Sequence, residues 1–332
     1  MASINFKHTP FGDLALISMR GCEDIASQVD YYLKQWRSIP DDESFVVPAN
    51  CPRFGTGEAK AVLKHTARGL DAYIICDCFN YSVTYKMYGQ TVPMSPDDHY
   101  QDLKRIIAAL GGKARRITVI MPMLYEGRQH RRTTRESMDC AMALQELVAM
   151  GVKNIVTFDA HDPRVNNAIP LDGFDNVQAA YQMIKALLKT VPDIKLNRDH
   201  TMIVSPDEGG MGRCIYYSSV LGLDLGMFYK RRDYSVVVDG RNPIIAHEFL
   251  GDNVEGKDVV IVDDMISSGE SMIEVATKLK ELKARRIFVC TCFGLFCNGL
   301  EAFDKAYESG LINKVFTTNL IYSCLLYTSD AA

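Results

Sequence analysis

One pattern recurs through both halves of the chain: a short β-branched run, a turn, an amphipathic helix, and a glycine before the next run. Such alternation is typical of parallel sheets whose strands are joined by helices. Strands are expected at residues 14–18, 71–76, 117–121, 154–158, 201–205, 225–229, 259–262, 286–291 and 314–320. Helices are expected at 25–36, 96–110, 137–150 and 271–282, with one more carrying Val177, Tyr181, Ile184 and Leu188 on one face. The pattern predicts an α/β fold with a mostly parallel, helix-flanked sheet in each half.

The same five-residue sequence occurs once in each half of the chain. Lys113–Ile117 and Lys283–Ile287 both read KARRI, and each lies between an expected helix and an expected strand. Either an internal duplication or a shared helix-to-strand turn chemistry accounts for this repeated sequence.

Length and charge narrow the class of protein. The chain has 332 residues, which corresponds to about two domains, with one large α/β domain as the alternative. Lysine and arginine number 37 against 41 aspartate and glutamate residues, a net charge of −4, so nothing indicates a nucleic-acid partner. No apolar run reaches the roughly 18 residues of a membrane helix. Because Lys7 and His8 stand where a signal peptide would be apolar, we expect a cytoplasmic protein without a membrane partner.

The ten cysteines are too sparse for a disulfide framework. Cys76 with Cys78, and Cys290 with Cys292, form two C-x-C pairs inside apolar runs. Zinc sites usually need C-x2-4-C spacing and a second pair of ligands. We therefore expect buried core thiols rather than a metal site.

The segment Val259–Ser271, VVIVDDMISSGES, carries the most specific chemistry. A buried strand leads to two acids, a Ser-Ser-Gly turn and the start of a helix. In parallel sheets, ligands bind beyond the carboxyl ends of the strands. There the N–H groups of the turn and of the helix N-terminus suit a phosphate, and Gly269 lets the backbone approach it closely.

Asp263 and Asp264 cannot serve that phosphate, because like charges repel. They are better placed to accept hydrogen bonds from sugar hydroxyls beside it, directly or through a metal. The segment therefore predicts a site for a phosphorylated sugar. The alternative is a solvated strand-to-helix loop with a capping serine.

Three further segments follow expected strands. Tyr125–Arg132 reads YEGRQHRR, and its arginines suit a nucleotide or polyphosphate, although a solvated basic loop is the alternative. Thr157–Pro163 (TFDAHDP) and Ser205–Gly210 (SPDEGG) place His161 and Asp207 at strand ends. An isolated His or Asp in such a position is more often a turn residue or a cap.

The segment VVIVDDMISSGES resembles the phosphoribosyl-pyrophosphate binding motif of type I phosphoribosyltransferase folds. The whole ordered set resembles the ribose-phosphate pyrophosphokinase family, from about Leu14 to Tyr322. The additional matches are PRFGTGE (52–58), YEGRQHRR, TFDAHDP, SPDEGG and YKRRDYS (229–235). The resemblance implies two similar phosphoribosyltransferase-like domains.

The resemblance also implies roles for individual residues on the nucleotide side. Phe54 and Glu58 would contact adenine, and Arg128 and Gln129 would hold the nucleotide and its phosphates. The Mg²⁺ that accompanies ATP would be organised by residues at two strand ends, His161 and Asp207.

On the ribose side, the resemblance implies catalytic residues and a sugar-phosphate site. Lys230 and Arg232 would be catalytic and close over the phosphates. Ribose hydroxyls would bind Asp263 and Asp264. The 5-phosphate would lie in the turn formed by Ser267, Ser268, Gly269 and Ser271.

The sequence departs from the family pattern at several positions. Thr56 stands where an acid is usual, and His130 where Asp is common. Asp233 replaces a common Pro, and Glu270 replaces a small residue in the phosphate turn. We expect the charge of Glu270 to point away from the ligand.

Pro, Gly and Asn cluster between Asp159 and Phe174, which predicts a domain boundary there, and we expect a first domain of residues 1–165. The resemblance implies that this domain leans toward nucleotide binding and that residues 313–322 pack back on it. It places the ribose-phosphate loop in a second domain, 166–312. The ending, residues 323–332, does not continue as the family does, and we expect it to be foreign.

The implied activity is transfer of the pyrophosphoryl group of ATP to the C1 hydroxyl of ribose 5-phosphate, giving AMP. The implied assembly is a homo-oligomer, a hexamer built from dimers. Two alternatives are a weakly active or non-catalytic regulatory subunit, and a nucleobase phosphoribosyltransferase. The departures support the first alternative, but the presence of Lys230, Arg232 and the two acids opposes it. The second alternative leaves the first half of the chain unexplained.

Overall fold

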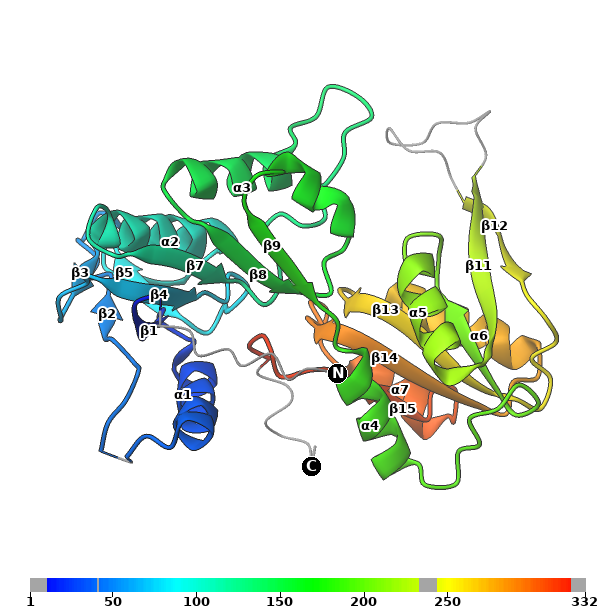
Figure 1. Ribbon diagram of the computed structural model, residues 1–332. Coiled ribbons are helices and arrows are strands. Elements are labelled where there is room, and N and C mark those ends of the chain that lie inside the picture. The colour runs from blue at the N-terminus through cyan, green and yellow to red at the C-terminus, as the bar shows by residue number, and fades with distance from the viewer. Residues whose placement is uncertain (1–10, 41, 233–243, 324–332) are drawn as a thin grey trace. The chain divides into compact units, whose positions relative to one another are not determined.

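The chain folds into two α/β units, and the computed structural model describes residues 11–40, 42–232 and 244–323. Unit 1 comprises the described residues up to Val177 together with Leu320–Tyr322. Unit 2 comprises the described residues of 178–319, and Ser323. The predicted fold class is confirmed, because each unit has a mostly parallel sheet flanked by helices (Figure 1).

Unit 1 is built on a five-stranded parallel sheet. In spatial order the strands are β1 (Asp13–Ser18), β4 (Leu70–Ile75), β7 (Arg116–Ile120), β8 (Asn154–Phe158) and β9 (Gly173–Val177). Two short antiparallel pairs accompany it: β2 (Ala49–Asn50) with β3 (Val62–Leu63), and β5 (Thr84–Met87) with β6 (Gln90–Pro93). The helices are α1 (Glu23–Arg37), α2 (Pro96–Leu110), α3 (Asp139–Ala149) and the 3-10 helix η1 (Pro163–Ala168).

Helix α2 shows how local sequence fixes an element of unit 1. Ser95 Oγ accepts the N–H of Asp98 at 3.2 Å, and the Asp98 carboxylate accepts the N–H of Ser95 at 3.0 Å, which is a capping box. Pro96 occupies the first turn, where no donor is needed. The apolar side of α2, including Leu103 and Ile107, is buried in the core of unit 1.

Unit 2 is built on a six-stranded sheet. In spatial order the strands are β12 (Ile244–Leu250), β11 (Asp224–Arg232), β10 (Thr201–Ser205), β13 (Asp258–Ile266), β14 (Arg286–Gly294) and β15 (Lys314–Phe316). β11 and β12 are antiparallel, and the other pairs are parallel. The helices are α4 (Ala180–Thr190), α5 (Met211–Leu221), α6 (Glu270–Glu281) and α7 (Glu301–Glu308).

Both faces of the unit 2 sheet are covered by helices. Val259 and Ile261 of β13 pack in one apolar cluster with α6 and α7. Val260 and Val262 pack in another cluster with α4 and α5. The continuous β-branched run therefore marks a parallel strand buried on both faces, as the sequence predicted.

Some segments differ from the sequence-based expectation. Val177 ends β9 instead of opening a helix, because Gly173–Val177 pairs with β8. The change of unit consequently follows Val177, not residue 165. The last strand is β15 alone, which pairs with β14 in unit 2, and only Leu320–Tyr322 are grouped with unit 1. Residues 324–332 of the expected foreign tail lie outside the described residues.

The C-x-C thiols are buried, as predicted. Cys76, Cys78, Cys290 and Cys292 are at most 2% exposed, and they form no disulfide. Within the ranges that the structure describes, no helix combines the length and the apolar character needed to cross a membrane.

The two KARRI segments occupy matching places in the two sheets. In unit 1, Arg116 donates to both carboxylate oxygens of Asp71, its register partner on β4. In unit 2, Arg286 donates to both oxygens of Asp258, its register partner on β13, at 3.1 and 2.8 Å. Arg285 adds a second fork to Asp258. Each pair joins a central strand to its neighbour at the amino end.

Asp258 is fully buried, so we expect Asp258→Asn to destabilise unit 2. The loss should be about 2–3 kcal/mol, below the about 3–5 kcal/mol of a fully buried pair, because both arginines reach solvent. The free energy of unfolding in urea measures it. Asp193→Asn is the matched control, because exposed Asp193 also pairs with Arg286 and its loss should change stability little. If the two substitutions lower the free energy of unfolding equally, the buried Asp258 carboxylate is not the stabilising partner of the two arginines.

Candidate functional site

The predicted ribose-phosphate segment lies at the carboxyl end of β13. The sequence predicted that the strand would end at the two acids. In the structure the strand continues past them to Ile266, beside β14. Asp264 is 2% exposed, and the side chain of Asp263 is 20% exposed. The N–H of Asp264 donates to Asp263 Oδ1 at 2.9 Å. Asp263 is therefore the more accessible of the two acids.

The turn after β13 requires a glycine. Gly269 has a φ of +88°, and a Cβ there would lie 2.4 Å from a ring carbon of Phe303. This residue caps α6, and its carbonyl accepts the N–H groups of Met272 and Ile273. Ser267 and Ser268 are half-buried, and Ser271 is exposed on the first turn. The arrangement is the strand–turn–helix N-terminus that suits an anion.

Glu270 is exposed on the first turn of α6. A negative side chain there interacts favourably with the helix dipole. The residue is therefore tolerated in the fold without entering the core.

The SPDEGG segment forms a tight turn between β10 and α5. Ser205 Oγ donates to the carbonyl of Asp207 at 2.6 Å, and Asp207 Oδ1 accepts the N–H of Gly209 at 2.8 Å. Because β10 neighbours β13, the turn brings the charge of Asp207 close to Asp263. Two segments far apart in sequence thus contribute acids to one edge of the sheet.

A buried arginine pairs with one of these acids, Asp263. Arg213, on the first turn of α5, has a side chain only 8% exposed, and its Nη1 lies 3.6 Å from Asp263 Oδ1. Burial and the charge of Asp264 raise the pKa of Asp263 well above its usual range, and Arg213 opposes that rise. Sequence reasoning missed Arg213, whose only signal was a basic residue just after the SPDEGG turn.

The acids of unit 2 fit a hard divalent cation. Carboxylate oxygens are ligands that Mg²⁺ prefers, and Mg²⁺ is usually held by one or two carboxylates together with substrate phosphates. Burial and, after it, repulsion from Asp264 raise the pKa of Asp263, and a cation bound there would relieve the repulsion. Among the described side chains, no group of three or more His, Cys, Asp or Glu forms a ready-made cage.

In unit 1, the YEGRQHRR segment follows β7. Arg128 is exposed, whereas the side chain of Gln129 donates to the carbonyl of Ser137 at 3.1 Å. Glu126 has a φ of +55°, and burial, followed by the charge of Asp139, raises its pKa. Arg128 therefore remains accessible to a ligand. Gln129 instead stabilises the loop to which it belongs.

His161 follows β8 and lies near His130, with ring centroids 5.4 Å apart. His130 Nε2 is 3.5 Å from Asp162 Oδ2. Hydrogen bonds from Arg164 lower the pKa of Asp162 to about 2, and burial lowers the pKa of His130. The departure at His130 thus places a second imidazole, whose pKa burial lowers, beside the predicted metal-binding histidine.

In the PRFGTGE loop, the two residues predicted to contact adenine are exposed to solvent. The ring of Phe54 is 55% exposed, and Glu58 is exposed. Thr56 Oγ1 donates to Glu58 Oε2 at 2.9 Å. Where the family usually has an acid, this chain therefore has a donor that orients Glu58 without adding charge.

The predicted catalytic residues Lys230 and Arg232 lie on β11, in register with His247 and Ile244 of β12. Their side chains lie outside what the structure describes, as does Asp233. Their roles therefore remain predictions.

Unit 1 has its own acid at the position equivalent to Asp264. Six residues after Asp71 comes Asp77, just as Asp264 comes six residues after Asp258. Asp77 is 3% exposed, and its two oxygens accept the N–H groups of Phe79 at 2.9 Å and Tyr322 at 2.8 Å. In unit 1, the chain itself therefore satisfies this carboxylate.

Comparison with known proteins gives two family-domain matches. Residues 14–151 match the N-terminal domain of ribose phosphate pyrophosphokinase, and residues 172–318 match a phosphoribosyl transferase domain.

Curated relatives match most of the chain. It is 30% identical over 275 residues to the ribose-phosphate pyrophosphokinase of Mycoplasma genitalium, covering 82% of this chain and 78% of the relative. It is 29% identical over 271 residues to that of Ralstonia nicotianae, covering 81% and 76%. The crystal structure of phosphoribosylpyrophosphate synthetase from Mycobacterium smegmatis superposes with a TM-score of 0.72 at 22% identity, covering 93% of this chain and 89% of that one. This structural similarity supports the fold.

Burial of Asp77 makes stability depend on pH. Burial raises its pKa to about 6, although the Tyr322 and Phe79 N–H groups act in the opposite direction. In the unfolded chain the pKa is about 3.9. The folded state therefore binds more protons between about pH 4 and 6, and the contribution of Asp77 to the free energy of unfolding falls as pH rises through this window.

We expect this contribution to fall by about 2–3 kcal/mol. The measurement is urea unfolding of the native chain and of Asp77→Asn from pH 4 to 7. Because Asn does not titrate, the native chain should lose stability relative to the variant as pH rises. If the two free energies of unfolding differ by a constant amount from pH 4 to 7, the pKa of Asp77 is not raised by folding.

Proposed function

Because this chain belongs to the ribose-phosphate pyrophosphokinase family, we propose that it transfers the pyrophosphoryl group of ATP to ribose 5-phosphate. The products are 5-phosphoribosyl 1-pyrophosphate and AMP. The observation that carries the proposal is the strand, acid pair, glycine turn and helix N-terminus at Asp258–Glu281, combined with matches to both family domains.

In unit 2, the site supports binding of the acceptor. The turn from Ser267 to Ser271 offers backbone N–H groups and hydroxyls to the 5-phosphate. Asp263 accepts hydrogen bonds from the ribose hydroxyls, and Asp264 supports it from its buried position. The Gly269 backbone lies against Phe303, which leaves no room for a side chain in the turn.

In unit 1, the exposed loops support binding of the donor. Phe54 offers an aromatic face to adenine, and Glu58, oriented by Thr56, accepts from its amino group. Arg128 contributes a guanidinium fork to the phosphates, and Gln129 holds the segment in shape.

The reaction is an in-line displacement at the β-phosphorus of ATP. The C1 hydroxyl oxygen forms the new P–O bond, the bond between the β-phosphorus and the α,β-bridging oxygen breaks, and AMP leaves with that oxygen. The hydroxyl proton passes to solvent or to a basic group. Such transfers depend mostly on positioning and charge neutralisation.

We assign charge neutralisation in the transition state to Lys230 and Arg232. We propose Asp207 as a Mg²⁺ ligand of unit 2 and His161 as a Mg²⁺ ligand of unit 1, and Mg²⁺ would supply Lewis-acid neutralisation of the polyphosphate when bound. We further propose that the chain acts as a homo-oligomer in the cytoplasm, where ATP is available. Sedimentation of the full chain tests the oligomeric state.

The first test of function is AMP formation from ATP. We expect AMP only when Mg-ATP and ribose 5-phosphate are both present, because the acceptor hydroxyl is the nucleophile. Chromatographic separation of the nucleotides measures it, and omission of each substrate is the control. ATP turnover without ribose 5-phosphate, or no AMP with both substrates, would exclude a synthetase; the second result would favour the regulatory subunit.

The second test concerns Lys230. Lys230→Ala should lower kcat by at least about 100-fold, because it removes a charge that stabilises the transition state. The binding of ribose 5-phosphate, measured by calorimetry, should stay nearly unchanged. Lys283→Ala is the control, since Lys283 is an exposed lysine of the same unit that pairs with Glu255. A variant at position 230 with near-normal turnover would remove Lys230 from the mechanism.

A further inference from the structure

The loop that carries Phe54 and Glu58 is a closed turn. The N–H of Phe54 donates to the carbonyl of Glu58 at 2.7 Å, and the N–H of Gly57 donates to the carbonyl of Phe54 at 2.9 Å. An antiparallel bridge joins Arg53 and Ala59 at its base. Gly57 has a φ of +92°, a conformation that glycine adopts readily. The turn therefore has a defined shape of its own.

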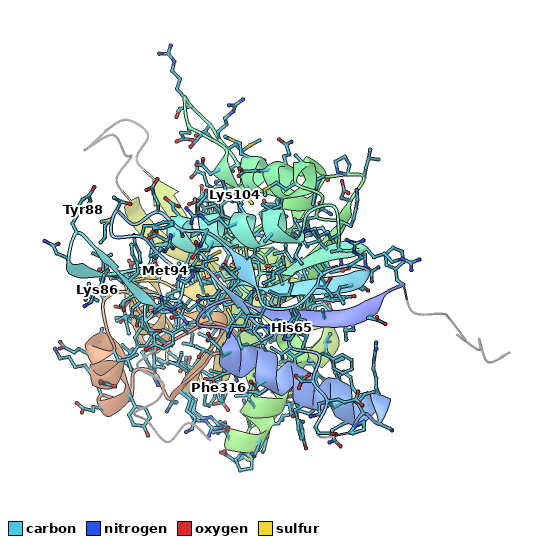
Figure 2. All side chains as sticks on the ribbon, turned by 90° about the vertical axis from the view of Figure 1, so that its left-hand side faces the viewer. His65, Lys86, Tyr88, Met94, Lys104 and Phe316 are labelled. Carbon is cyan, nitrogen blue, oxygen red and sulfur yellow. The ribbon has the colours of Figure 1, made fainter. Side chains whose placement is uncertain are left out.

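The turn docks on the β5–β6 hairpin. The N–H of Tyr88, at the hairpin tip, donates to the carbonyl of Gly55 at 2.8 Å. Tyr88 has a φ of +49° and Gly89 one of +80°, which is the pattern of a two-residue type I′ turn. In Figure 2, Tyr88 extends outward from the tip, whereas Met94, just after β6, lies deeper. The hairpin thus supports the outer part of the loop.

Arg53 points the other way from the exposed Phe54, and its side chain is only 8% exposed. Its Nη1 donates to the carbonyl of Gly57 at 3.3 Å, and its Nη2 lies 2.9 Å from Asp102 Oδ2 of α2. The guanidinium carbon is 4.7 Å from the centroid of the Tyr85 ring. One side chain therefore joins the loop, a helix of the core and a strand of the hairpin.

This geometry cannot be provided by a simple ammonium group. The guanidinium is a planar fork that can bond a carbonyl and a carboxylate at once while stacking on a ring. Asp102 is also bonded by Arg105, whose Nη1 lies 2.6 Å from Asp102 Oδ1. Asp102 consequently keeps a cationic partner when Arg53 is altered, whereas the Gly57 carbonyl loses its bond to the side chain.

An exposed phenylalanine contributes little to folding where it stands. Holding its ring and the Glu58 carboxylate in a fixed position outside the core is useful for a ligand that would otherwise have to order the loop on binding. We infer that Arg53 is the positioning residue of the nucleotide loop, presenting Phe54 and Glu58 to the adenine end of ATP. The inference rests on the proposed function, since it assumes that these two residues bind the nucleotide.

The test compares Arg53→Lys with Arg105→Lys. Both substitutions keep the charge beside Asp102, but only the first removes a bond to the loop. Arg53→Lys should raise KM for ATP about tenfold, as expected for the loss of one hydrogen bond from a charged group. The KM for ribose 5-phosphate and the kcat at saturating ATP should stay within about twofold. Arg105→Lys should leave all three constants nearly unchanged.

Binding of a non-hydrolysable ATP analogue, measured by calorimetry, gives a readout independent of turnover. Thermal unfolding of each variant identifies any general loss of stability. If both substitutions raise KM for ATP equally, or if Arg53→Lys lowers kcat alone, Arg53 does not position the loop.

Phe54→Ala separates this inference from the proposed function. If Phe54→Ala leaves analogue binding unchanged, the nucleotide role of the loop is wrong, and the inference falls with it. If Phe54→Ala weakens binding and Arg53→Lys does not, only the inference is wrong. We expect the double variant to bind more tightly than the sum of the two single effects predicts, because part of the effect of Arg53 passes through Phe54. Fully additive effects would contradict that dependence.

Discussion

An aspartate–arginine pair across the amino ends of two neighbouring strands fixes the alignment on which both units depend. Asp71 with Arg116, and Asp258 with Arg286, are also register partners in their parallel ladders. A slip of one residue would separate each pair and would turn every later side chain to the other face of the sheet. The acids at the far ends of the central strands are placed by this constraint.

The same pair bears on the origin of the two halves. Turn chemistry alone explains why KARRI joins a helix to a strand twice. It does not explain why the second arginine pairs in both units with an aspartate in the first two residues of a strand. Asp71 precedes Arg116 by 45 residues, whereas Asp258 precedes Arg286 by 28, so the intervening segments have diverged. The matching positions of Asp77 and Asp264 extend the similarity to the opposite edge of the sheets. These observations favour duplication.

The sequence predicted the parts whose structure is local. The β-branched run at Val259–Val262 and the turn at Gly269 follow from short-range physics, and both were recognised. Val177 was misplaced because an apolar residue beside a helix can equally end a strand, and its pairing with β8 is a long-range contact. The roles of Arg213 and Arg53 were not identified from the sequence for a similar reason. Their importance lies in partners that only the fold brings near.

The bond between the Tyr322 N–H and Asp77 has a consequence for biosynthesis. Most of unit 1 leaves the ribosome early, but Leu320–Tyr322 are made only after the whole of β10–β15. Until then, the buried carboxylate of Asp77 lacks one of its two donors, and such a group is costly in a protein interior. The nascent first unit therefore stays incomplete while the second is being synthesised. Its final closure requires that the strands of the second unit have already been translated.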